Sequence, residues 1–308
     1  MSSTQKTPAS NPEPYFVGEL GSKWSFPSDH LPIGVSIEQI HIAFWNVLHT
    51  ASLHYIESNA QGLRDCQIIT KKNPVRAGSL LTEREEYVLQ EIMNMVNHDT
   101  HPRSLIGLQE INENVLNELY LRLPLAWAIT TPSNQPNSED IFIYNTQVFD
   151  FISSADTRYR LDDPRTIFTL TLQQKSSNEL FRIVQSHIPG GPIKSGPGCK
   201  TFAQEALKQY DPELTTLLMG DMNQPTFVLE KYLEKEAEKK GIHQPFQPLL
   251  ISYPTHINTL KQASWIDNFF IYNPFNKKIE PSSPGYLTSL VESTAQLLIH
   301  SASHNPLG

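Results

Sequence analysis

Short apolar runs that end in polar residues recur along the chain and predict β-strands. The runs IGVSI (33–37) and IHIAFWNVL (40–48) are separated only by Glu38 and Gln39, a spacing that permits a tight hairpin. Further runs have the same character: SLIGLQEI (104–111), DIFIYN (140–145), TIFTLTLQ (166–173), LFRIVQSHI (180–188), LTTLLMGDMN (214–223) and WIDNFFIYN (265–273). The chain is therefore rich in predicted strands.

Helical periodicity is clearest in the stretch TEREEYVLQEIMNMV (82–96), where apolar residues return every three or four positions. Thr82 is a suitable N-cap for this helix, and Glu85, three positions later, completes the pattern of a capping box. Two more helices are predicted near residues 199–210 and 226–240. Strands outnumber helices, which favours an α+β fold over an alternating α/β fold.

No internal repeat or low-complexity linker divides the chain. We therefore expect a polar, flexible N-terminus over residues 1–24 and a single domain over residues 25–308, built from two mainly antiparallel sheets packed face to face. Apolar residues at helical spacing predict a C-terminal helix at 285–300. We interpret it as a packing helix, and a helix that binds a partner is the alternative.

Charge and cysteine content narrow the class of protein. With 24 Lys and Arg against 32 Asp and Glu, the net charge of −8 argues against a protein that binds nucleic acid by neutralising phosphates over its whole surface. Binding through a local basic patch is still compatible with this charge. The two cysteines, Cys66 and Cys199, lack the spacing of a zinc site and are too few for a disulfide framework. We find neither a transmembrane run nor a secretory signal, so we expect a soluble cytoplasmic protein, with signal-less export left open.

Polar side chains with the potential for chemistry stand where the predicted strands end. They are Asn46, Glu110, His187, Asp221, Asn223 and Asp267. Each one alone has an ordinary explanation, because Asn and Asp cap helices and form turns. Together they suggest a site assembled by loops on a rigid scaffold. Carboxylate and amide oxygens are the ligands of Mg²⁺ or Mn²⁺, and such a site suits hydrolysis of phosphate esters.

A Ser-Asp-His run near the start of the chain, within PSDHLP (27–32), supplies an imidazole next to a carboxylate. Together with FWNVL, LQEIN, SHIPGGP, GDMNQP and WIDNFFIY, the stretch SDHLPIGVSI (28–37) resembles the motif set of the endonuclease/exonuclease/phosphatase superfamily. The resemblance covers nearly the whole chain. It implies a DNase I-like fold, a four-layered α/β/β/α sandwich in which helices flank the two packed sheets.

The order of these motifs differs from that of the superfamily, in which the Ser-Asp-His motif comes last. Here it comes first, and the chain resembles a circularly permuted member in which the final strand of the family, 33–37, is joined to the first, 40–48. The C-terminal sequence SASHNPLG offers His304 as a rival to His30. We favour His30 because a predicted strand follows it and none follows His304.

The resemblance also implies metal ligands. Glu110 is expected to be the principal ligand of Mg²⁺ or Mn²⁺. Asn46 is expected beside it, coordinating the metal or a phosphate oxygen, and Asp29 is expected to face the metal.

Roles in catalysis and in phosphate binding are implied in the same way. Asp221 is expected to orient or deprotonate the attacking water, and Asn223 and His187 to contact the substrate phosphate. His30 is expected to stabilise the transition-state oxygens or to donate a proton, with Asp267 fixing its tautomer.

The substrate is less narrowly defined than the reaction. We expect a metal-dependent phosphodiesterase or phosphatase, with a nucleic acid or nucleotide slightly favoured over a lipid or inositol phosphate. GDMN continues with Gln224 and Pro225 instead of the Arg usual in phosphoinositide phosphatases. The alternatives are a phosphoinositide phosphatase or sphingomyelinase-like enzyme, a catalytically inactive binding module of the same fold, and an interaction protein that recruits a partner through its C-terminal helix. The sequence identifies no protein partner.

Overall fold

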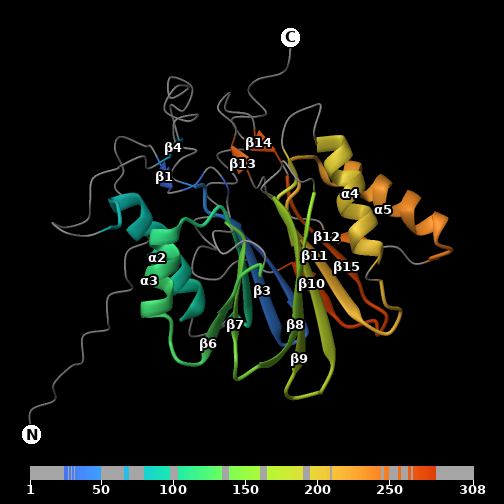
Figure 1. The fold of residues 1–308 in the computed structure, drawn as a ribbon, viewed down its shortest axis with the longest axis horizontal. Helices are drawn as coiled ribbons and strands as arrows, with labels where there is room; N and C mark the ends of the chain where they lie inside the picture. The colour runs from blue at the N-terminus through green and yellow to red at the C-terminus, as the bar shows by residue number, and fades with distance from the viewer. Residues whose placement is uncertain are drawn as a thin grey trace, which may run out of the picture.

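Two sheets packed face to face form the centre of the structure (Figure 1). This computed structural model describes residues 24–26, 28, 30, 32–49, 66–68, 80–97, 103–133, 139–159, 165–189, 195–208, 210–243, 246–249, 256–257, 263–264 and 266–281. The predicted C-terminal helix at 285–300, His304, Asp29 and most of the predicted N-terminal segment lie outside these residues.

The first sheet contains six strands in the order β16 (Ile279–Pro281), β2 (Ile33–Ile37), β3 (Ile40–Asn46), β5 (Leu105–Gln109), β7 (Ile141–Asn145) and β6 (Trp127–Thr130). Its central pair, β3 and β5, is parallel, and the other neighbours are antiparallel. The hairpin of β2 and β3 turns through two residues as predicted, with Glu38 at a positive φ of 54°.

The second sheet also contains six strands, in the order β12 (Gln247–Leu249), β15 (Asp267–Tyr272), β11 (Thr215–Asp221), β10 (Leu180–Ser186), β9 (Thr166–Gln174) and β8 (Phe149–Arg158). Its central pair, β10 and β11, is parallel, and its other neighbours are antiparallel. Both sheets therefore have the same succession of pair types, with one parallel pair in the middle. Because the two central strands of each sheet are parallel, the residues that follow them lie at the same edge of that sheet.

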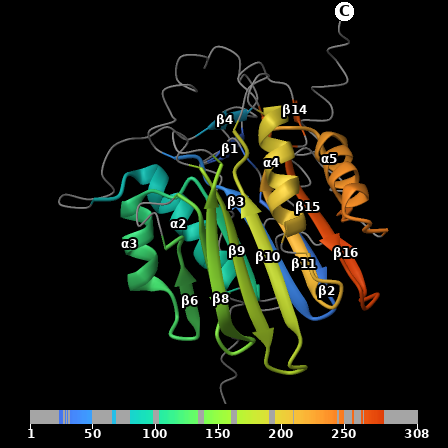
Figure 2. The ribbon, with the colours of Figure 1, turned by 45° about the vertical axis from the view of Figure 1, so that its right-hand side comes forward.

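Helices cover the outer face of each sheet. The helices α2 (Glu83–Val96) and α3 (Glu113–Arg122) lie on the first sheet, and α4 (Ser195–Lys208) and α5 (Thr226–Lys239) lie on the second (Figures 1 and 2). The predicted capping box at the start of α2 is present, with Thr82 and Glu85 bonding to each other's backbone N–H. The predicted four-layered, DNase I-like α+β sandwich is confirmed.

Burial on both faces explains why the central strands read as continuous apolar runs. Phe44 packs between the sheets and its neighbour Trp45 packs under α2, because successive side chains of a strand point to opposite faces. Phe269 and Phe270 divide in the same way between the centre and the layer under α4 and α5. The sheets approach closely at Gly107, where a Cβ would stand 2.1 Å from Met219 Cε.

Two short two-stranded sheets complete the described elements. They pair β1 (Trp24–Phe26) with β4 (Cys66–Ile68), and β13 (His256–Ile257) with β14 (Ala263–Ser264). None of the helices in the described residues is long and apolar enough to cross a membrane.

Candidate active site

The polar residues predicted at strand ends come from the centre of both sheets. Asn46 is the last residue of β3 and Asp221 the last of β11, while Glu110 directly follows β5 and His187 directly follows β10. The antiparallel neighbours β2 and β15 begin at the same edge, so the strand starts contribute His30 and Asp267. The topology thus brings together residues that are far apart in sequence.

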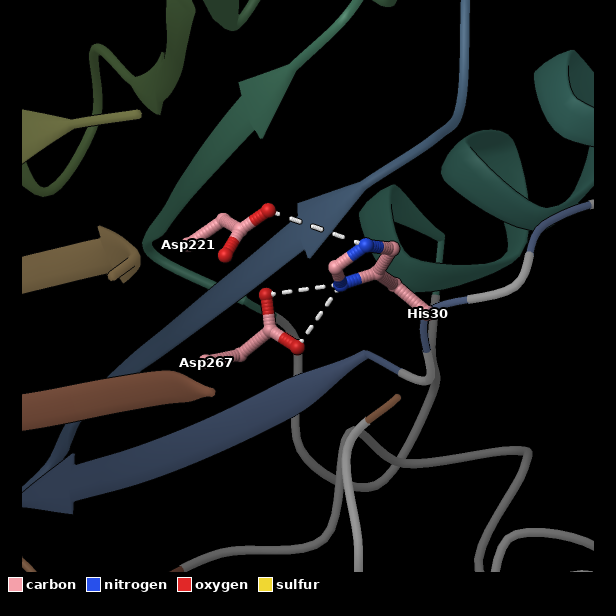
Figure 3. A group of neighbouring side chains, drawn as sticks. All are labelled: His30, Asp221 and Asp267. Carbon is pink, nitrogen blue, oxygen red and sulfur yellow. Dashed lines mark hydrogen bonds and ion pairs between the residues drawn. The ribbon is translucent and has the colours of Figure 1, made fainter. Parts of the chain in front are cut away.

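His30 and Asp267 form a hydrogen-bonded pair (Figure 3). The Nδ1 atom of His30 lies 2.8 Å from Oδ2 and 3.0 Å from Oδ1 of Asp267. Both side chains are buried, and the opposite ring nitrogen, Nε2, faces Oδ2 of Asp221 at 3.7 Å. A carboxylate at Nδ1 retains a proton on that nitrogen, and Nε2 is then directed into the site.

The backbone around His30 is fastened to the end of β3. Ser28 Oγ donates to the carbonyl of Asn46 at 2.8 Å and accepts the N–H of His30 at 3.1 Å. The indole N–H of Trp45 donates to the carbonyl of His30 at 3.0 Å. These bonds place the imidazole beside the first sheet, although its partner Asp267 belongs to the second.

Asp221 is held from both sheets. Its backbone N–H donates to Gln109 Oε1 on β5 at 3.0 Å, and its Oδ1 accepts the N–H of Asn223 at 2.8 Å. Its Oδ2 accepts from Nδ2 of Asn46 at 3.3 Å and lies 3.6 Å from Nε2 of His187. The carboxylate, 2% exposed, is therefore surrounded by groups that donate hydrogen bonds or can carry positive charge.

Asn46 joins the two carboxylates through its amide group. Its Nδ2 donates to Glu110 Oε1 at 3.0 Å as well as to Asp221, and its Oδ1 accepts the N–H of Leu48 at 3.0 Å. Because a backbone N–H can only donate, the Leu48 bond assigns the orientation of the amide. In this orientation the amide oxygen of Asn46 is bonded to Leu48, and its hydrogens face the carboxylates.

Glu110 is fixed by a second donor and by an unusual backbone conformation. Its Oε2 accepts the N–H of His49 at 2.9 Å. Both Glu110 and Leu48 have positive φ, 59° and 61°, which is uncommon for residues other than glycine. Positive φ at these positions turns the chain after β3 and β5, and the N–H of His49 meets the carboxylate of Glu110 there.

His187 and Asn223 lie on the side of the second sheet. The ring of His187 bridges the carboxylates, with Nδ1 3.8 Å from Glu110 Oε1 and Nε2 close to Asp221. Asn223, at a φ of 47°, donates from Nδ2 to the carbonyl of Ile188 at 2.8 Å. The loops after β10 and β11 are thereby joined.

Sequence reasoning missed two buried polar residues in this region. Gln109 was read as part of an apolar run, and its bond to Asp221 spans 112 residues. Asp140, directly before β7, is buried, and Thr166 Oγ1 donates to it at 3.4 Å. Burial raises the pKa of Asp140 to about 7, and the charge of His187 opposes this shift. The signal for Asp140 is a carboxylate directly before the apolar run IFIYN (141–145).

Known structures share this architecture. An endonuclease/exonuclease/phosphatase protein from Bacteroides vulgatus is similar with a TM-score of 0.51 and 11% identity, over 78% of this chain and 87% of that one. The human Nocturnin catalytic domain, solved with a bound sulfate anion, has a TM-score of 0.50 and 13% identity, over 81% and 98%. The fold is that of the endonuclease/exonuclease/phosphatase structures. No family model and no curated protein sequence matches the chain.

The potential metal ligands at this edge of the endonuclease/exonuclease/phosphatase fold suit a hard divalent cation. The carboxylates of Glu110 and Asp221 share one amide donor on Asn46, so two oxygen ligands lie close together. His30, Asp221 and Asp267 also bring three potential ligand atoms within 4.8 Å of one another. Oxygen-rich surroundings with few nitrogen ligands favour Mg²⁺ or Mn²⁺ over zinc.

Proposed function

We propose that the chain is a divalent-metal-dependent hydrolase of phosphate esters. The observation that carries this proposal is the meeting of Glu110, Asp221, His187 and the His30–Asp267 pair at one edge of the two sheets. Carboxylates, an oriented imidazole and amide donors are groups that can carry out the hydrolysis of a phosphate ester with a bound metal ion. The endonuclease/exonuclease/phosphatase fold supports the same reaction class.

Glu110 is the residue we assign as principal ligand of Mg²⁺ or Mn²⁺. The N–H of His49 and the amide of Asn46 each bond one oxygen of its carboxylate and orient it. The other candidate ligands from the sequence are Asn46, whose amide oxygen accepts the N–H of Leu48, and Asp29, which lies outside the described residues. The ion, when bound, would neutralise negative charge on the phosphoryl oxygens.

Asp221 and His30 are the residues we assign to proton transfer. The Oδ2 atom of Asp221 is the acceptor for a proton of the attacking water, and His187 and Asn46 stabilise the negative charge of this carboxylate. His30, as an imidazolium with Nδ1–H held by Asp267, would donate from Nε2–H to a phosphoryl or leaving-group oxygen. His187 and Asn223 are the assigned contacts to the phosphate.

We also propose that the chain is circularly permuted. Two features support this: His30 precedes β2 and bonds Asp267, and β2 continues through a two-residue turn into β3, which ends at Asn46. In the superfamily the strand after the Ser-Asp-His motif lies beside the strand that carries the first motif. A direct connection of these two strands changes the chain order and leaves the sheet unchanged.

We favour a nucleic acid or nucleotide over a lipid or inositol phosphate as the substrate. The reason is that Gln224 and Pro225 follow Asn223 in place of the Arg usual in phosphoinositide phosphatases. We retain the cytoplasm as the expected compartment of this enzyme. A panel of single- and double-stranded DNA, RNA, poly(A), phosphoinositides and sphingomyelin, each with Mg²⁺ or Mn²⁺, tests the assignment. Turnover of the polynucleotides supports it, and turnover confined to the lipids selects the phosphoinositide or sphingomyelinase alternative. Binding without turnover of any substrate selects the inactive binding module.

A further inference from the structure

The first turn of α2 contacts both loops that carry the proposed metal-binding residues. Arg84, 2% exposed, donates from Nη2 to the carbonyl oxygen of Val47 at 3.2 Å and to that of Leu48. Val47 and Leu48 directly follow Asn46 at the end of β3. A buried guanidinium on a helix of the outer layer therefore holds the loop between Asn46 and His49.

One peptide group lies between Arg84 and Glu110. The carbonyl of Leu48 accepts from Arg84, and the N–H of the same peptide group, that of His49, donates to Glu110 Oε2 at 2.9 Å. The C=O and N–H of a trans peptide are coplanar and point in opposite directions. The guanidinium and the carboxylate thus bond opposite edges of one peptide plane.

A second contact from the same turn reaches the loop of Glu110. Glu85, which closes the capping box of α2, accepts from Asn112 Nδ2 at 2.5 Å. Asn112 is the N-cap of α3 and stands two positions after Glu110. The first turn of α2 therefore holds the loop after β3 through Arg84 and the loop after β5 through Glu85.

We propose that Arg84 is a positioning residue for the metal-binding carboxylate of Glu110. A positive charge at the carbonyl polarises the Leu48–His49 peptide and strengthens the hydrogen bond from its N–H to Glu110 Oε2. That bond fixes Oε2 and leaves Oε1 directed toward Asn46 and His187. This inference rests on the proposed metal-dependent function, because it assigns the consequence of the arrangement to metal affinity.

The backbone conformation makes this support necessary. Leu48 has a φ of 61°, which costs a non-glycine residue free energy and persists only where the surroundings hold it. Val47 and Leu48 are both buried, so removal of the guanidinium deprives two enclosed carbonyl oxygens of a strong donor. The peptide is then free to rotate, and its N–H no longer points at Glu110.

Binding of Mn²⁺ alone to the full chain, followed by electron paramagnetic resonance, tests the role of Arg84. Arg84→Met keeps much of the side-chain volume and removes the donors, and we expect about tenfold weaker binding than in the wild type. Arg84→Lys keeps the charge and we expect about threefold weaker binding. The matched control is Arg103→Met, since Arg103 is equally buried but precedes β5 at the end away from Glu110. Wild-type affinity in Arg84→Met, or an equal loss in Arg103→Met, would overturn the proposal.

Hydrogen exchange of the His49 amide separates this inference from the proposed function. Without any metal, Arg84→Met and Arg84→Lys should lose protection at His49 while Arg103→Met retains it. A wild-type chain that binds no Mn²⁺ contradicts the proposed function and the assigned effect on metal affinity, but the His49 amide still reports whether Arg84 holds the peptide. Unchanged His49 protection in both Arg84 variants contradicts the positioning role, even where Mn²⁺ binds normally.

Discussion

The imidazole of His30 and the carboxylate of Asp267, 237 positions apart in the chain, are joined by a hydrogen bond of 2.8 Å between Nδ1 and Oδ2. The bond connects the two sheets, because His30 precedes β2 and Asp267 begins β15. It also determines which nitrogen of the imidazole is presented to Asp221. We therefore expect the pair to act as one unit in catalysis.

Replacement of Asp267 by Asn tests the pair. The neutral amide cannot stabilise the imidazolium of His30 as the carboxylate does, so we expect kcat to fall by about 10³-fold with KM changed little. Steady-state kinetics on the best substrate of the panel measures both constants. Asp150→Asn is the control, since Asp150 is an exposed carboxylate on β8 paired with Lys175. A kcat within threefold of the wild type in Asp267→Asn contradicts the role of this pair.

Gln109 provides a second prediction. Its Oε1 accepts the N–H of Asp221, so Gln109→Leu leaves a buried donor without its acceptor and releases the position of Asp221. We expect kcat to fall by about tenfold or more and the free energy of unfolding to fall by about 1–3 kcal/mol. Gln185→Leu is the matched control, because this buried amide also crosses between the sheets but bonds the carbonyl of Leu108. An equal loss of kcat in both variants at equal stability would show that Gln109 has no particular effect on Asp221.

The fold was predictable because burial in the layers of the sandwich determines where apolar residues occur along the chain. Adjacent apolar residues such as Phe44 and Trp45 both lie in buried layers, so a continuous apolar run indicated a central strand. The edge strand β8 was missed because most of its side chains are at least partly exposed, and it shows no such run. The helix α3 was not predicted, because it follows Glu110 after only two residues and its N-cap, Asn112, is the last residue of the motif LQEIN.

Residues of the candidate site could be predicted from the sequence where a polar side chain coincides with a strand end. Glu110 and Asp221 stood out because a carboxylate follows an apolar run. The supports of these residues could not be predicted in the same way. Gln109 lies inside an apolar run, and Arg84 belongs to a helix whose sequence reads as an ordinary amphipathic one. The functions assigned to them depend on contacts between elements that no local pattern encodes.

The free energy of unfolding is expected to fall with rising pH because of the buried carboxyl group of Glu91. Burial on α2 raises the pKa of this carboxyl group from 4.5 to about 7. The folded state therefore retains the proton while the unfolded chain releases it, and stability is lost as the pH rises from about 4.5 to about 7. Glu91→Gln removes this loss, so we expect the variant to be more stable than the wild type by about 3 kcal/mol at pH 8.

Urea denaturation at pH 4 and at pH 8 measures this difference for Glu91. The two proteins should have similar unfolding free energies at pH 4 and diverge at pH 8. Glu234→Gln, a change of an exposed carboxylate on α5, serves as the control. A constant difference between Glu91→Gln and the wild type at both pH values contradicts the prediction.

Lys277 lies at the end of the sheets opposite the candidate site. It contacts Glu38 in the turn between β2 and β3 and Glu179 in the turn between β9 and β10. Its Nζ lies 2.5 Å from Glu179 Oε2, 3.5 Å from Glu38 Oε2 and 5.4 Å from the ring centre of Phe181. Because the Lys277 side chain is only 5% exposed and its partners Glu179 and Glu38 are 34% and 52% exposed, we expect Lys277→Met to cost about 1–3 kcal/mol of unfolding free energy. Turnover should stay within twofold of the wild type, and a larger loss of turnover would indicate a coupling to the site that this structure does not explain.

The central claim is that the residues around Asp221 form a metal-dependent phosphoesterase site, and hydrolysis of bis-p-nitrophenyl phosphate tests it most directly. Wild type and Asp221→Ala would be compared with Mg²⁺, with Mn²⁺ and with EDTA, after circular dichroism shows that both are folded. The account predicts turnover by the wild type that requires the metal and falls by at least about 10³-fold in Asp221→Ala. Turnover that persists in EDTA, or that survives in Asp221→Ala, would contradict it.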